Sequence, residues 1–119
     1  FAEIPNPEQA QEIVHAHLIP FDLENFYLMP STPYYSEKFD PKRYWRGPVW
    51  INMNWMFMQG LQSYGYEFWA DLVKQDTFEL IEQFGIYEYY HPKKSDTEGC
   101  GSSHFSWTAA LFLDLLHRS

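Results

Sequence analysis

The chain has 119 residues and a formal net charge of −8, from 8 basic and 16 acidic side chains, and this length fits one domain with a modest core. Lys and Arg are nowhere concentrated enough to track phosphates, so a nucleic-acid partner is disfavoured, and no apolar run approaches the roughly 20 residues of a membrane span. Cys100 is the only cysteine, which excludes an internal disulfide and a cysteine-based metal site.

A first helix is predicted over residues 6–18. Asn6 is a good N-cap, Pro7 suits the first helical position, and Gln9 can complete a capping box. Pro20 ends this helix. Its inner face is marked at helical spacing by Ala10, Ile13, Val14 and Leu18.

An irregular segment follows, because five prolines lie between Pro20 and Pro48. Its length of about 28 residues is unusual for a loop in a compact domain, and such loops are often functional.

Three further helices are predicted, over residues 48–65, 66–84 and 105–117. The first is apolar nearly all round, which indicates burial on most sides, whereas the second has one charged face and ends at Gly85. This alternation is expected of a double-layered helical barrel, so we predict an all-α fold. The best candidate for a short strand is the segment Ile86–Tyr90. The inner residues of the last two helices are Trp69, Leu72, Val73, Leu80, Phe84, Leu111, Phe112 and Leu115.

Aromatic residues are abundant, with 10 Phe, 9 Tyr and 5 Trp, which is more than a core of this size needs. One interpretation, which we favour, is that part of this aromatic surface packs on a partner or on further chain. The other is a sugar site, because apolar sugar faces lie on Trp and Tyr rings while polar ring groups bond the hydroxyls. Both can hold together.

The segment Gly85–Pro92 places Glu88 among three tyrosines, between a helix end and a proline. Aromatic rings lower the local dielectric around a carboxylate, and tyrosine hydroxyls can bond it, so Glu88 is a candidate general base. The alternative is a surface glutamate beside aromatic packing, and spacing alone favours that alternative.

The segment Tyr44–Trp55 places Trp45 and Arg46 at the mouth of the predicted buried helix, with Trp50 in its first turn. Tryptophans in this setting are more often core than ligand contacts. We expect Arg46 to form a salt bridge that locks two loops. We expect buried Asn in this helix to bond a neighbouring loop.

The segment Glu98–Ala110 is a Gly/Ser-rich turn that leads into a helix. It lacks the lysine and the spacing of a phosphate-binding P-loop. His104 could bond a ligand or cap the helix. The histidines lack the H-E-x-x-H spacing, which disfavours a zinc site, and no G-x-S-x-G segment marks a serine hydrolase.

Taken together, the three segments resemble glycoside hydrolase family 63, which includes processing α-glucosidase I and the mannosylglycerate and glucosylglycerate hydrolases. The shared pattern is Y-W-R-G-P-V-W-I-N-x-N (Tyr44–Asn54), then an aromatic-E-x-Y loop (Tyr87–Tyr90), then F-S-W-T-A-A (Phe105–Ala110). The resemblance covers residues 30–116. It implies that residues 1–119 are the C-terminal portion of an (α/α)6 barrel of twelve helices, to which this chain would contribute about four.

The resemblance also assigns roles to residues. Glu88 matches the general base of an inverting mechanism, Trp45 and Trp50 match the aromatic walls of a sugar subsite, and the family's acidic partner lies upstream of the matched region. The full set expected to contact substrate is Tyr44, Trp45, Arg46, Trp50, Tyr90 and His104.

The function implied is inverting hydrolysis of an α-linked glucoside or mannoside, either an oligosaccharide or a glycosylglycerate. One carboxylic acid would protonate the leaving oxygen and a second carboxylate would activate water, with no metal or organic cofactor required. The expected partners are a carbohydrate substrate and either the rest of the barrel or a second copy covering the apolar surface, with no membrane and no nucleic acid. The alternative is a non-catalytic carbohydrate-binding or helical packing module, which would need the aromatic residues but not Glu88.

Overall fold

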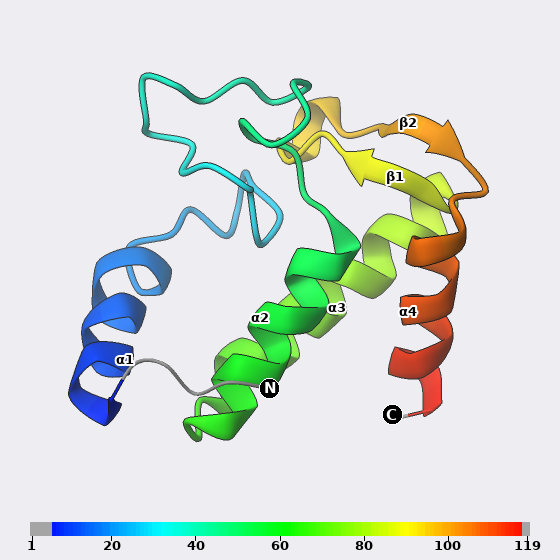
Figure 1. Cartoon of the computed structure of the whole chain (residues 1–119). Coiled ribbons are helices and arrows are strands. Elements are labelled where there is room, and N and C mark those ends of the chain that lie inside the picture. The colour runs from blue at the N-terminus through cyan, green and yellow to red at the C-terminus, as the bar shows by residue number, and fades with distance from the viewer. Residues whose placement is uncertain (1–5, 118–119) are drawn as a thin grey trace.

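The computed structural model describes residues 6–117 and shows a mainly helical chain with one small β-hairpin (Figure 1). The helix α1 (Pro7–Ile13) continues into a π-helical turn (Val14–Leu18), and a long irregular segment leads to α2 (Ile51–Ser63) and α3 (Glu67–Phe84). The strands β1 (Tyr87–Tyr90) and β2 (Gly99–Ser103) flank a 3-10 turn (Lys94–Asp96), and α4 (Ser106–His117) follows.

The first helix begins where the sequence predicts. The Asn6 side chain accepts a hydrogen bond from the Gln9 N–H at 2.8 Å, and the Gln9 side chain accepts one from the Asn6 N–H at 3.0 Å. These two bonds satisfy backbone donors that a helix N-terminus otherwise leaves free. Three of the four residues predicted on the inner face are buried, but Ile13 is exposed, because it borders a pocket described below.

The helices α2, α3 and α4 pack side by side, with α2 in contact with both of the others. Their main apolar cluster also takes in the π-helical turn and the irregular segment. Its buried members are Val14, Leu18, Leu28, Met58, Leu61, Ala70, Val73 and Leu115. The apolar α2 is only half-buried along much of its length within the described residues. No helix among residues 6–117 is long and apolar enough to cross a membrane.

The helix α2 begins at Ile51, three residues later than Pro48, where the sequence predicts its start. The reason is that the preceding backbone is used for pairing. The Pro48 carbonyl accepts from the Ser31 N–H at 3.1 Å, and Val49 exchanges two backbone hydrogen bonds with Tyr90. Trp50 is therefore still extended, with φ −110° and ψ 130°. The third helix ends at Gly85 as predicted, with φ 90°, a conformation that suits glycine.

The all-α prediction is correct for most of the chain but misses half of a hairpin. The strand β1 lies within the predicted segment Ile86–Tyr90, and it pairs antiparallel with β2. The sequence of β2 is Gly-Cys-Gly-Ser-Ser, which has little intrinsic preference for strand structure, so its conformation comes from pairing with β1.

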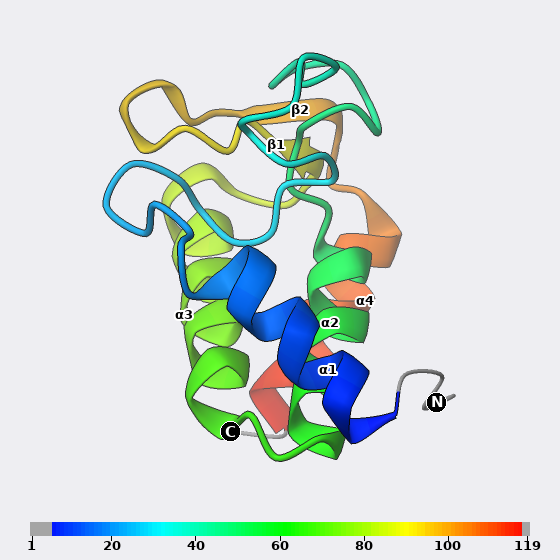
Figure 2. The same ribbon diagram turned by 90° about the vertical axis from the view of Figure 1, so that its left-hand side faces the viewer.

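The hairpin and the irregular segment before α2 lie at the same end of the helices, as the two perpendicular views show (Figures 1 and 2). Backbone bridges join these parts, because Phe26 pairs with Lys93, Pro30 with Val49, and Val49 with Tyr90. The segments that carry the candidate site residues therefore meet at one end of the fold.

Asn54 fixes the irregular segment to the helices and confirms the prediction that a buried Asn bonds a loop. It is 1% exposed. Its Oδ1 accepts from the Met29 N–H at 2.9 Å, and its Nδ2 donates to the Leu28 carbonyl at 3.0 Å and to Thr77 Oγ1 at 2.9 Å. Both polar atoms of the Asn54 amide thus have partners inside the fold.

Replacing Asn54 with Leu should destabilise the protein strongly, because the substitution leaves buried backbone groups of Leu28 and Met29 without partners. A buried unsatisfied group costs about 1–3 kcal/mol, so we expect a clear fall in the melting midpoint. Calorimetry of Asn54→Leu beside Asn52→Leu, a half-buried position on the same helix, checks this. Equal melting midpoints for the two variants would contradict it.

Candidate active site

The three segments singled out in the sequence meet at β1. Val49, just before α2, donates to the Tyr90 carbonyl and accepts from the Tyr90 N–H, both at 2.9 Å. On the other side, the His104 N–H donates to the Ile86 carbonyl at 2.7 Å, and Thr108 Oγ1 of α4 donates to the Tyr87 carbonyl at 2.8 Å. Direct hydrogen bonds therefore bring the three segments together.

Glu88 lies opposite a β-bulge. Tyr87 pairs with Ser103 and Tyr89 with Cys100, so β2 carries one residue more than β1 between these pairs. Gly101 lies in this bulge, and its backbone has a positive φ of +71°, which suits glycine. A Cβ atom at Gly101 would lie 2.9 Å from the Glu88 Cβ and 2.9 Å from the Tyr89 ring. A bulge of this kind bends the strand and re-aims the side chain opposite it, which here is Glu88.

Tyr90 anchors β1 from inside. It is 0% exposed, and its hydroxyl donates to the Gly85 carbonyl at 2.7 Å and accepts from the Tyr87 N–H at 3.1 Å. Burial raises the pKa of Tyr90 to about 12, which keeps this hydroxyl protonated at neutral pH. Further chain could only bury Tyr90 more, so it has no surface to offer a sugar, contrary to the expectation that it contacts substrate.

An aromatic stack, formed by Trp45, Trp50 and Tyr89, includes the residue that follows Glu88 in β1. The rings of Trp45 and Trp50 stack with centroids 3.9 Å apart and planes 11° apart, and Trp50 and Tyr89 stack at 5.0 Å and 25°. Tyr44 meets all three rings edge-on, at centroid distances of 4.9–5.8 Å. Such edge-on and stacked pairs are the preferred aromatic geometries.

The members of the aromatic stack differ in what they can touch. Trp50 lies between the other two rings, is 2% exposed, and donates its Nε1–H to the Tyr44 carbonyl at 2.8 Å. Trp45 is 42% exposed and Tyr44 is 51% exposed. Trp50 therefore supports the stack from within, as the core interpretation expects, while Trp45 and Tyr44 present free aromatic surface.

Arg46 and His104 both lie on the surface of this end of the molecule. Arg46 Nε donates to the Lys38 carbonyl at 3.0 Å, so the residue stiffens its own loop. The predicted Arg46 salt bridge is wrong for the described residues, since the ion pair that joins two segments here is Lys42 with Glu98. His104 has φ 55° and precedes α4 by two residues, so its backbone holds the end of the hairpin and its exposed side chain is not the helix cap.

Tyr89 and Thr108 also belong to the arrangement around β1, and the sequence interpretation missed them. Burial raises the pKa of the Tyr89 phenol above its usual value near 10, and the nearby charges of Cys100 and Glu88 add to the rise. Its O–H is therefore available as a donor at neutral pH. Tyr89 adjoins Glu88 and Thr108 lies in the F-S-W-T segment, so both residues are in segments that the sequence interpretation singled out. Residue spacing, however, does not predict which groups their side chains contact.

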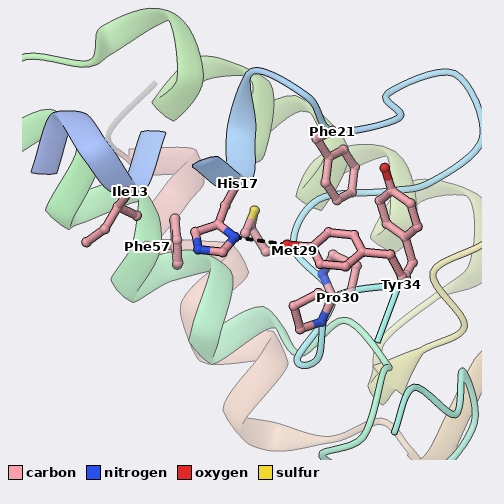
Figure 3. Close-up of a pocket in the computed structure, with 9 residues that line it drawn as sticks. Ile13, His17, Phe21, Met29, Pro30, Tyr34 and Phe57 are labelled. Carbon is pink, nitrogen blue, oxygen red and sulfur yellow. Dashed lines mark hydrogen bonds between the residues drawn. The ribbon is translucent and has the colours of Figure 1, made fainter. Parts of the chain in front are cut away.

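An apolar hollow lies elsewhere in the fold. A pocket of about 320 Å³ opens between α1, the irregular segment and α2, and Figure 3 shows His17 and Phe57 on its walls. His17 Nδ1 is hydrogen-bonded to the Tyr35 hydroxyl at 3.1 Å. The pocket shares no residue with the aromatic stack or with Glu88. Its lining consists of Ile13, His17, Phe21, Met29, Pro30, Pro33, Tyr34, Tyr35 and Phe57.

Metal-binding side chains do not cluster in the part of the chain that the structure describes. Within residues 6–117 no three His, Cys, Asp or Glu side chains gather closely enough to hold a metal ion. What β1 and its neighbours bring together is one carboxylate, an exposed tryptophan face and tyrosine hydroxyls.

Comparison with known proteins identifies the same segments in a known family. Residues 1–108 match the mannosylglycerate hydrolase MGH1-like glycoside hydrolase domain. The chain is 48% identical over 87 residues to mannosylglycerate hydrolase of Thermus thermophilus, covering 73% of this chain and 20% of that protein. It is 39% identical over 89 residues to glucosylglycerate hydrolase of Mycolicibacterium hassiacum, covering 75% of this chain and 20% of that protein.

The fold agrees with the sequence match. The crystal structure of a GH63 mannosylglycerate hydrolase from Thermus thermophilus in complex with glucose superposes with a TM-score of 0.83 and 38% identity, covering 97% of this chain and 28% of that one. The chain thus spans only about a quarter of the length of these relatives. It belongs to the GH63 family of mannosylglycerate hydrolase MGH1-like glycoside hydrolases, and it corresponds to part of their length.

Proposed function

We propose that these residues supply the general base and part of the sugar subsite of an inverting α-glycosidase that cleaves a glycosylglycerate. Residues 1–119 would form the C-terminal segment of an (α/α)6 barrel in which the remaining helices and the general acid come from further chain. The observation that supports this best is that Tyr89, the residue after Glu88 in β1, belongs to the aromatic stack, whose exposed Trp45 ring can receive a sugar face.

Glu88 suits the role of base because of how it is held. It lies opposite the bulge at Gly101, and its neighbours Tyr87, Tyr89 and Tyr90 are fixed by hydrogen bonds or ring contacts. Inverting glycosidases place their two carboxyl groups roughly 6.5–9.5 Å apart, with a water between the base and the sugar. A rigid strand is a precise support for such a residue.

The choice of substrate rests on the relatives. One is a mannosylglycerate hydrolase and another a glucosylglycerate hydrolase. A glycerate carboxylate would need a cationic or hydroxyl partner, and the exposed Arg46, His104 and Tyr44 are groups of this kind among the expected substrate contacts. Arg46 uses its Nε on the Lys38 carbonyl, which leaves its terminal nitrogens for an anion.

A non-catalytic carbohydrate-binding or packing module is the alternative. The burial of Trp50 and Tyr90 favours this alternative in part, because the two side chains stabilise the fold and have no surface left for a ligand. Such a module would use the Trp45 surface but would not depend on the carboxylate of Glu88, so the two functions separate at that residue.

Glu88→Gln in the complete enzyme should abolish turnover and leave substrate affinity nearly intact, because the amide keeps the shape but cannot take a proton from water. We expect a fall in kcat of at least ~10²–10⁴ on mannosylglycerate or glucosylglycerate. The matched control is Glu82→Gln, which changes an exposed carboxylate on α3. Full activity of purified Glu88→Gln would overturn the proposal.

The released sugar should carry the inverted anomeric configuration. A base-activated water attacks the face opposite the leaving group in a single displacement. Proton NMR in the first minutes of reaction, before mutarotation, distinguishes the two anomers. Retained configuration would instead indicate a covalent nucleophile and a closer carboxylate pair.

The isolated 119-residue chain should be inactive and self-associating. Large apolar side chains are exposed on several helices of the described part, and the rest of a barrel would cover them. We expect dye binding, oligomers in light scattering, and no glycoside hydrolysis. A monodisperse monomer that binds no hydrophobic dye, or one that turns over substrate unaided, would contradict the barrel assignment. The exposed apolar helix residues are Ile13, Phe68, Trp107, Leu113 and Leu116.

A further inference from the structure

Thr108 uses its buried hydroxyl on a backbone group of a distant segment. It is the third residue of α4 and 2% exposed. A threonine hydroxyl in a helix commonly bonds the carbonyl four residues earlier, as Thr77 does with Val73 at 2.8 Å. Thr108 instead donates 2.8 Å across to the Tyr87 carbonyl, 21 residues away in sequence.

The accepting carbonyl belongs to the peptide group that joins Tyr87 to Glu88. The Glu88 N–H lies in the same plane, because the peptide group is planar. Fixing this plane fixes the backbone direction from which the Glu88 side chain starts. The neighbouring peptide is held as well, because the Tyr87 N–H donates to the Tyr90 hydroxyl.

The bond matters most at this point of β1 because the ladder is irregular here. The register shifts between Tyr87 and Tyr89, opposite Gly101, so regular pairing with β2 is interrupted at Glu88. Thr108 therefore supplies, from a helix, a restraint that a regular neighbouring strand would otherwise provide.

We propose that Thr108 is a positioning residue that holds the carboxylate of Glu88 in its catalytic geometry through the Tyr87 carbonyl. This inference rests on the proposed function, in which Glu88 activates the water. Thr108 itself touches neither the sugar nor the water. A displacement of about 1 Å at a reacting group can cost 10²-fold in rate, which sets the size of the expected effect.

The test compares Thr108→Val, which keeps the shape and removes the donor, with Thr108→Ser, which keeps the donor, in the complete enzyme. Thr108→Val should lower kcat about 10- to 100-fold with little change in KM, and Thr108→Ser should restore most of the rate. The matched control is Thr77→Val, which removes an equally buried hydroxyl whose hydrogen bonds go to Val73 and Asn54 and not to β1, and which should leave kcat unchanged. If Thr108→Val fails to fold, Thr108→Ala is measured with the same expectation.

A second substrate shows whether the effect passes through the base. An α-glycosyl fluoride leaves without needing a proton, so the general acid becomes dispensable while water activation does not. The loss in Thr108→Val should be as large on the fluoride as on the glycosylglycerate. A loss confined to the glycosylglycerate would place the effect on the acid or on the glycerate subsite and overturn the inference.

The double variant Glu88→Gln/Thr108→Val separates this inference from the proposed function. If Thr108 acts only through Glu88, the double variant should be no slower than Glu88→Gln alone. A normal kcat in Thr108→Val beside an inactive Glu88→Gln would overturn the inference and leave the proposed function standing. A fully active Glu88→Gln would overturn the proposed function, and with it the route assigned to Thr108.

Discussion

The two backbone hydrogen bonds between Val49 and Tyr90 are the constraint on which this end of the molecule depends. They keep the chain extended up to Trp50, so α2 starts at Ile51 and the Trp50 ring lies flat against Tyr89. A helix that started at Pro48 would take Val49 out of the pairing. The position of the aromatic stack thus follows from a short stretch of strand-like backbone more than from the helices themselves.

The aromatic residues at this end of the molecule fall into two groups, one buried and one exposed. Trp50 and Tyr90 are buried and use their polar atoms on backbone carbonyls, so they serve packing and loop geometry. Trp45 and Tyr44 remain exposed at the mouth of α2. An exposed ring that already stacks on a buried ring loses little conformational entropy when a ligand binds to it. The buried Trp50 therefore lowers the entropy cost of ligand binding at Trp45.

Local signals in the sequence predicted local structure well. The capping box at Asn6, the end of α3 at Gly85 and the loop-bonding role of Asn54 each depend on side chains whose usual partners are known from residue type. The strand β2, the bulge at Gly101 and the Thr108 bond could not be predicted. They depend on segments far apart in sequence, and Gly-Cys-Gly-Ser-Ser adopts a strand only because β1 lies beside it. The family resemblance made Glu88 the candidate base, but its surroundings required coordinates.

The bulge also limits how this site could be redesigned. Two features exclude any residue other than glycine at position 101. Its φ is positive, and the Glu88 and Tyr89 side chains occupy the space that a Cβ atom would need. The neighbouring Ser102 and Ser103 are exposed and carry no such restriction. In a library of substitutions across β2, most changes at residue 101 would therefore disrupt the hairpin, and the tolerated diversity would lie in the two serines that follow.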